Sequence, residues 1–224
     1  ENMYGTYFSN PLSDLIQNEN YSRSTQVYVN AFADIKLWKG LVFRTEYAAN
    51  YNYNTGYRFT PSYDYEFFKQ QSSASRSAGN GSNWTLKTYL TYNGTFGKHN
   101  VSVMAGHEAQ ENNWESLDGS RTNFLFNSVH ELNAGDATTA KANSSRGSSA
   151  IESYFGRLNY NFADRYLLTA TLRADGSSSF AKESRWGWFP SVALAWKVNN
   201  EAFLKDVEAI NSLKLRLGLS LIHI

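Results

Sequence analysis

Segments in which every second residue is apolar are joined by connections that alternate between short and long along this chain. The clearest segment runs from Trp188 to Val198. One of its faces carries Trp188, Pro190, Val192, Leu194, Trp196 and Val198. The other face carries Ser191, Ala193, Ala195 and Lys197, with Phe189 as its only bulky member. Because consecutive side chains of a strand point to opposite faces, this segment is predicted to be a β-strand with one apolar side.

The same alternation predicts eight strands. They lie at about residues 25–37, 41–53, 84–96, 101–110, 154–162, 166–175, 188–198 and 213–220. The turns after the first, third and fifth strands are short, whereas long polar connections follow the second, fourth and sixth. One of these connections includes residues 71–82, which are rich in Ser, Gly and Asn and are predicted to be a loop. The longest connection spans about residues 112–149.

Short connections after odd-numbered strands and long connections after even-numbered strands are typical of bacterial outer-membrane barrels. In these barrels the periplasmic turns are short and the extracellular loops are long. A soluble sandwich gives no reason for this alternation. The charged residues on the less apolar faces would be costly in a dry core and cost little beside a hydrated lumen, although a soluble domain would place them on its surface. These residues are Asp34, Lys36, Arg44, Glu46, Glu108, Arg157, Arg173 and Asp175. The pattern therefore predicts an all-β fold, an antiparallel transmembrane β-barrel segment. The alternative is a soluble β-sandwich with a binding or adhesion function.

Composition narrows the possible functions. The chain of 224 residues has no cysteine, which excludes disulfides and thiolate metal sites. Its net charge of +1 gives no electrostatic basis for binding nucleic acid. Aromatic residues make up 16% of the chain, as expected where aromatic girdles mark both lipid interfaces. The mean hydropathy of -0.51 is compatible with a membrane barrel, because only alternate residues of each strand face lipid.

No constellation of residues predicts catalysis, a metal site or a cofactor. The histidines are scattered and have no ligand-spaced partners: His99, His107, His130 and His223. The segment Asp175–Ser179 is rich in oxygen atoms but lacks the acidic repeat and the distal glutamate of a calcium loop. The ligand-binding candidates are aromatic residues assigned to the longest loop, namely Trp114, Phe124 and Phe126. Their rings either stack on a sugar or serve as girdle and loop-packing residues.

Two stretches resemble a known family: residues 153–178 (SYFGRLNYNFADRYLLTATLRADGSS) and residues 185–196 (RWGWFPSVALAW). The family is the SusC/RagA group of TonB-dependent outer-membrane transporters of Bacteroidota. Weaker similarity covers most of the chain from about Thr25 to Ser220. The 153–196 stretch is the most specific part, because strand, turn and loop residues match together there.

The resemblance implies a barrel of roughly 22 strands around an N-terminal plug, placed in the outer membrane of a Gram-negative bacterium. It also implies import of an oligosaccharide or a peptide. The implied partners are a SusD-like surface lipoprotein as a cap, the TonB–ExbB–ExbD complex as the energy source, and outer-membrane lipid.

The chain departs from the family pattern in length. It matches about eight strands without a plug, and after Ser220 the residues Leu221–Ile224 replace the family sequence. We therefore expect an internal fragment of a longer gene product. Residues 1–224 would form a single partial barrel domain, with residues 221–224 as a non-native tail.

Overall fold

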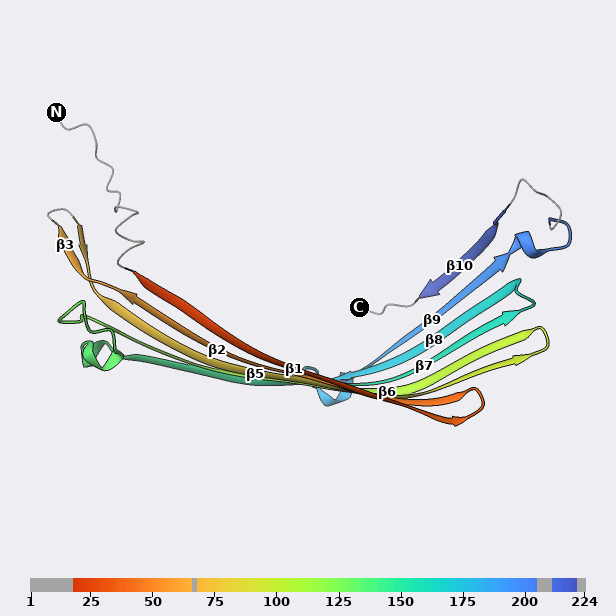
Figure 1. Ribbon diagram of the computed structural model, residues 1–224, viewed down its shortest axis with the longest axis horizontal. Helices are drawn as coiled ribbons and strands as arrows, with labels where there is room; N and C mark the ends of the chain where they lie inside the picture. Colours follow the sequence, from red (N-terminus) through yellow and green to blue (C-terminus); the bar gives the residue numbers. More distant parts are fainter. Residues whose placement is uncertain (1–17, 66–67, 205–210, 221–224) are drawn as a thin grey trace, which may run out of the picture. The chain divides into compact units, whose positions relative to one another are not determined.

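The eight predicted strands form one antiparallel sheet in the computed structural model, which describes residues 18–65, 68–204 and 211–220. Each strand is hydrogen-bonded to the next strand of this sheet along the sequence, and Figure 1 shows them in this order. The strands are β1 (Glu19–Trp38), β2 (Leu41–Thr60), β5 (Ser73–Phe96), β6 (His99–Thr122), β7 (Lys141–Phe162), β8 (Tyr166–Ser177), β9 (Trp186–Lys197) and β10 (Lys214–Ser220). The predicted all-β class and the predicted set of eight strands are confirmed.

The connections carry only short elements. These are the strands β3 (Tyr63–Tyr65) and β4 (Phe68–Gln70), and the 3₁₀ turns η1 (Leu132–Ala134), η2 (Ala137–Thr139), η3 (Lys182–Ser184) and η4 (Val198–Asn200). In the described part of the chain, no helix is long and apolar enough to cross a membrane. The sandwich alternative requires a large second sheet, whereas the described residues add only the β3–β4 pair to the main sheet.

The chain divides into two compact units. The first unit consists of Glu1–Val27, Asn50–Ser82 and Asn113–Ser148. The second unit consists of Tyr28–Ala49, Asn83–Asn112 and Ser149–Ile224. The five strands β1, β2, β5, β6 and β7 each contribute a segment to both units. The single barrel domain over residues 1–224 stays a prediction, as does the non-native tail, because residues 221–224 lie outside the described residues.

The short hairpin turns of the second unit use left-handed backbone conformations. Gly40 has a φ of 82° in the turn after β1, and Gly97 has a φ of 61° in the turn after β5. Ala163 and Asp164 join β7 to β8 with φ values of 53° and 55°. Two consecutive residues with positive φ are typical of a type I′ turn, whose twist matches that of the paired strands. All three predicted short turns are confirmed.

Asp164 fixes the β7–β8 turn through its polar contacts. Its carboxylate accepts hydrogen bonds from Lys197 Nζ at 2.6 Å and from the Nδ2 atoms of Asn161 and Asn200 at 3.2 Å each. Asn200 Nδ2 also donates to the Asp164 carbonyl at 2.7 Å. The hydrogen bond from Lys197 is the largest of the causes that lower the pKa of Asp164.

Glu201 holds the connection after β9 against the same turn. Its buried carboxylate accepts hydrogen bonds from Tyr166 Oη at 2.7 Å, Trp196 Nε1 at 3.0 Å and Arg165 Nη1 at 3.0 Å. The Tyr166 hydrogen bond contributes most to lowering the pKa of Glu201. Charge-assisted hydrogen bonds are stronger than neutral ones, so this end of the hairpins is well fixed.

The register of β7, β8, β9 and β10 separates two kinds of side chain in the second unit. One cross-strand row is Leu158, Ala170, Val192 and Leu219. The neighbouring row is Arg157, Thr171, Ser191 and Ser220. Because paired residues of an antiparallel sheet share a face, the first row lies on an apolar face and the second on a polar face. This register confirms the predicted alternation.

In the first unit the strands are longer than predicted. The loop prediction for residues 71–82 is wrong, because β5 begins at Ser73. The predicted loop at 112–149 shortens to residues 123–140, because β6 continues to Thr122 and β7 begins at Lys141. Small polar residues carry no apolar alternation, yet their backbone groups pair as well as those of apolar residues. A strand without an apolar face can therefore still form through this pairing.

A small apolar cluster holds the long loop of the first unit in place. It consists of Tyr57, Phe59, Ala74 and Phe124, with Leu132 packed against them. Ser72 fixes the start of the loop, because the Phe124 N–H donates to its Oγ at 2.7 Å and the Asn123 N–H donates to its carbonyl at 3.0 Å. The loop therefore packs on β2 and β5.

We expect Gly106→Ala to destabilise the wall. A Cβ atom at Gly106 would lie 2.5 Å from Tyr89 Cβ and 2.7 Å from Phe155 Cζ. Relieving such overlaps costs about 1–3 kcal/mol in a well-packed site. Gly156→Ala is the matched control, because the nearest atom to its added Cβ is Met104 O at 3.8 Å. Thermal unfolding of the full-length barrel in detergent measures the difference, and equal melting temperatures for the two variants would contradict the expected clash.

The Asp164 cluster predicts an acid dependence of stability. A carboxylate with a lowered folded pKa adds stability that is complete above its unfolded pKa of about 4 and is lost as the pH falls through the folded value. Lys197→Gln removes the largest cause, so we expect it to reduce the loss of melting temperature on acidification. Lys182→Gln, in η3, is the control. If both variants keep the acid dependence of the unmodified protein, Asp164 is not its source.

Candidate functional site

The apolar face of the second unit is exposed. β8 and β9 each have a hydrogen-bonded neighbour on both sides, yet Leu172, Val192 and Leu194 remain 46%, 44% and 50% exposed. Soluble proteins rarely expose contiguous rows of large apolar side chains. This face therefore requires an apolar environment outside the protein, which lipid supplies.

Aromatic side chains border this apolar face at two levels of the second unit. Near the hairpin turns, Tyr166 stacks on Phe162 and on Trp196, with ring centroids 6.4 Å apart in both pairs. At the other level, the Tyr154 ring lies 4.8 Å from His107 and 6.0 Å from Trp186.

The spacing of the two aromatic levels fits a membrane. Along β7, Tyr154 and Phe162 are separated by about 26 Å at the rise of an extended strand. With the tilt of roughly 40° that is usual for barrel strands, this becomes ~20 Å of height, close to the apolar band of ~25 Å in outer-membrane barrels. The two levels therefore correspond to aromatic girdles.

The polar face of the second unit carries a compensated cluster of charges. Arg173 Nε lies 2.7 Å from Asp175 Oδ1, and Arg173 Nη2 donates to the fully buried Ser153 Oγ at 2.9 Å. Glu108 lies between two cations, 3.8 Å from Arg173 and 3.4 Å from Lys87. Four neighbouring strands contribute to this cluster, which suits a hydrated lumen.

A second charged group lies at the beginning of the sheet. Arg44 Nε is 2.6 Å from Glu46, Arg44 Nη1 is 3.5 Å from Asp34, and the guanidinium lies 4.8 Å from the centroid of the Phe32 ring. Tyr89 Oη donates to Glu46 at 3.3 Å. Asp34, Arg44, Glu46 and Tyr89 thus form a chain of polar contacts across β1, β2 and β5. Within residues 18–65, 68–204 and 211–220, no group of three or more metal-ligating side chains is found.

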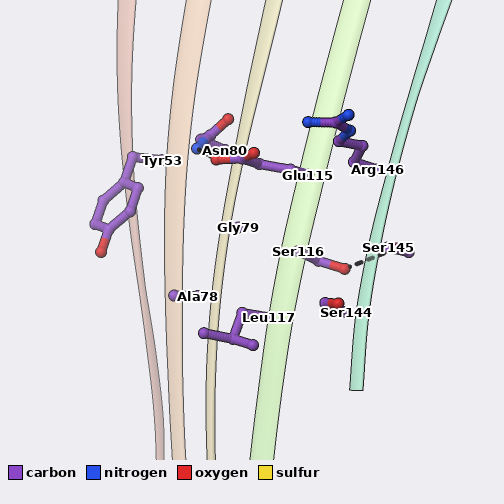
Figure 2. Close-up of a pocket in the computed structure, with 10 residues that line it drawn as sticks. All are labelled: Tyr53, Ala78, Gly79, Asn80, Glu115, Ser116, Leu117, Ser144, Ser145 and Arg146. Carbon is purple, nitrogen blue, oxygen red and sulfur yellow. Dashed lines mark hydrogen bonds between the residues drawn. The ribbon is translucent and has the colours of Figure 1, made fainter. Parts of the chain in front are cut away.

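The first unit contains an open pocket of about 570 Å³, lined by β2, β5, β6 and β7. Figure 2 shows its polar side chains, Asn80, Glu115 and Arg146, together with the Tyr53 ring. Asn80 Nδ2 donates to Glu115 Oε1 at 2.7 Å. Sequence reasoning missed these residues because three of their four strand segments, those of β5, β6 and β7, were assigned to loops.

The predicted ligand-binding aromatics occupy three different environments. Trp114 lies in β6 rather than in a loop, is 46% exposed, and its ring covers Gly147 so closely that a Cβ there would collide with it. Phe124 is buried and packs edge-on against Phe59 at 5.5 Å. Phe126 is 68% exposed in the loop. Trp114 and Phe126 therefore offer accessible rings, whereas Phe124 belongs to the apolar cluster.

An exposed apolar face between two aromatic girdles, backed by a polar face with paired charges, defines the wall of an outer-membrane β-barrel. A family model described as TonB dependent receptor-like, beta-barrel, matches residues 2–220. The chain belongs to this family and is an outer-membrane protein.

Named relatives agree with this assignment. The chain is 33% identical over 225 residues to TonB-dependent receptor P3 of Formosa agariphila, across 96% of this chain and 22% of that protein. It is 40% identical over 139 residues to TonB-dependent receptor SusC of Bacteroides thetaiotaomicron, across 61% of this chain and 13% of that protein. The chain thus spans less than a quarter of these relatives. The resemblance to the SusC/RagA group is confirmed.

Solved structures share the fold. The structure titled as the RagAB peptide transporter superposes with a TM-score of 0.88 at 22% identity, across 96% of this chain and 24% of that chain. The same importer in a state titled open-open gives a TM-score of 0.89 at 21% identity. The matched part makes up 24% of each of these two chains.

Two adjacent positions of β9 test which face contacts lipid. Val192→Lys places a charge on the apolar face midway between the two aromatic levels, where it costs about 2–4 kcal/mol, so we expect impaired membrane assembly. Ala193→Lys places the same charge on the polar face, opposite Thr169 and Gly218, and we expect normal assembly. The readout is the fraction of full-length protein in the outer membrane that is resistant to urea extraction. Equal assembly of both variants would refute a lipid-facing side.

Proposed function

We propose that this chain forms part of the barrel wall of a TonB-dependent importer of the SusC/RagA kind. The observation that carries the proposal is the two-faced sheet: an apolar face exposed between aromatic girdles, and a polar face on which Arg173, Glu108 and Asp175 compensate one another. A wall of this kind supports passage of a hydrophilic solute and performs no chemistry of its own. The relatives reported above are named as receptors and transporters, in keeping with a non-enzymatic role.

The proposed cargo is an oligosaccharide or a peptide. The 40% identity to SusC favours the first class, and the fold shared with a structure titled as a peptide transporter is compatible with the second. We further propose a SusD-like surface lipoprotein as the partner at the extracellular mouth. The TonB–ExbB–ExbD complex would supply energy through parts of the transporter outside this chain.

We propose Trp114 as a contact for this cargo. Trp114 and Glu108 both have even residue numbers in β6, so their side chains are expected on the same face of the strand. Because Glu108 lies on the polar face, the Trp114 ring is expected on the lumen side. Gly147 leaves room for the ring close to the backbone of β7, and the side chain is 46% exposed, which leaves ring surface for stacking. Phe126 is a second accessible ring in the long loop.

Trp114→Ala tests the proposed contact in the full-length protein with its lipoprotein partner. Loss of one stacking ring should weaken binding of the cargo about tenfold, and Trp114→Phe should weaken it less. The probes are neutral oligosaccharides and mixed-sequence peptides, screened by calorimetry, and the tightest is used for the comparison. Trp188→Phe, on the exposed apolar face, is the control and should bind normally. Unchanged affinity for Trp114→Ala would remove this residue from the cargo path.

A further inference from the structure

Four polar or aromatic side chains of the first unit form one row across neighbouring strands. The Asn80–Glu115 hydrogen bond links β5 to β6. Ser116 of β6 and Ser145 of β7 share a hydrogen bond of 2.9 Å. Because the two strands are antiparallel, Glu115, which precedes Ser116, lies opposite Arg146, which follows Ser145. Figure 2 shows this hydrogen bond and the row beside it.

Tyr53 extends the row to β2. A Cβ atom on Gly81 would lie 2.8 Å from Asn52 Oδ1, so Gly81 lies opposite Asn52. In this antiparallel pair the adjacent residues Asn80 and Tyr53 then also lie opposite each other. The row Tyr53–Asn80–Glu115–Arg146 therefore crosses β2, β5, β6 and β7. With neighbouring strands ~4.8 Å apart, it measures about 14 Å.

The chemistry of the row suits a neutral sugar. Asn80 gives one amide hydrogen to Glu115, which leaves its second amide hydrogen, its carbonyl oxygen and Glu115 Oε2 for a ligand. Arg146 adds a planar hydrogen-bond donor, and its positive charge offsets the negative charge of Glu115. Adjacent donors and acceptors of this kind match the hydroxyls of a pyranose ring, and the Tyr53 ring, 43% exposed, offers an apolar surface for stacking.

The row has the parity of the lipid-facing positions. Tyr53 is odd in β2, as are Leu41 and Phe43, and Arg146 is even in β7, as are Tyr154 and Leu158. Asn80 and Glu115 likewise follow the parity of Leu90 in β5 and Val103 in β6. Because side chains alternate along an uninterrupted strand, the row is expected to face away from the lumen. Trp114 has the opposite parity, so its proposed cargo contact is separate.

The position of the row along the strands points to the extracellular side. In each strand it lies toward the long connections and away from the short hairpin turns, which are periplasmic in outer-membrane barrels. The environment there is the sugar layer of the outer leaflet, which in Gram-negative bacteria consists of lipopolysaccharide.

We propose that the Tyr53–Asn80–Glu115–Arg146 row is a binding site for the neutral core sugars of an outer-leaflet glycolipid. Tyr53 stacks on a sugar ring, while Asn80, Glu115 and Arg146 bind its hydroxyls. The proposal rests on the assignment of the chain to a barrel wall and is independent of what the transporter imports.

Native mass spectrometry of the full-length protein in detergent tests this site. The probe is a rough-type lipopolysaccharide that contains lipid A and the core oligosaccharide. Arg146→Ala removes a charged hydrogen-bond donor, so we expect about tenfold weaker binding of this probe. Arg58→Ala is the matched control, because Arg58 is also an exposed arginine of the first unit but has the opposite parity in β2. Its affinity for the probe should equal that of the unmodified protein.

Two further arms identify the ligand. With lipid A that lacks core sugars, Arg146→Ala and the unmodified protein should bind equally; a persisting difference would assign the row to phosphate and overturn the sugar site. Binding of the imported cargo should be unaffected by Arg146→Ala. A loss there would assign the row to cargo instead. Equal glycolipid binding by Arg146→Ala and the unmodified protein would also overturn the proposal, whether or not cargo import is observed.

Discussion

Backbone pairing between strands is the interaction on which the rest of this structure depends. In hydrocarbon every N–H and C=O group must find a partner within the protein, and a sheet in which each strand pairs with its sequence neighbour meets this demand. Once pairing is fixed, the two faces of each strand are free to meet different solvents. Leu194 and Ala193 are adjacent in β9, yet one faces the exposed apolar side and the other the polar side.

Pairing also explains where charge is tolerated. Arg173, Asp175 and Glu108 lie within 4 Å of a partner of opposite sign, at the aromatic level where Tyr154 pairs with Ala174. A solitary charge within a membrane-crossing strand is costly, whereas a compensated cluster on a hydrated face is not. The turns follow the same logic, since Asp164 and Glu201 draw several donors together where the hairpins leave the membrane.

The sequence predicted those strands in which one face contacts an apolar environment and the other face contacts water. In β9 the contrast between Trp188, Val192 and Leu194 and their small neighbours set both the strand and its orientation. The contrast vanishes in residues 73–82 and 141–148, where Ser, Gly and Asn occupy both parities, so the sequence alone predicts loops there. The Asn80–Glu115 contact was missed for this reason, because it becomes visible only when the register between the two strands is known.

On one face of a strand, the residue types change from apolar to polar with increasing distance from the short hairpin turns. On β7, even positions change from Leu158 and Tyr154 to Arg146 and Ser144, while odd positions stay small or polar throughout, apart from Ile151 and Phe155. The lumen side of the wall is hydrated along its whole length. Only the residues that face outward therefore change in type at the boundary between hydrocarbon and sugar. Polar residues at outward positions are therefore selected by the environment outside the barrel, which is the physical basis for assigning Arg146 and its row to glycolipid rather than to cargo.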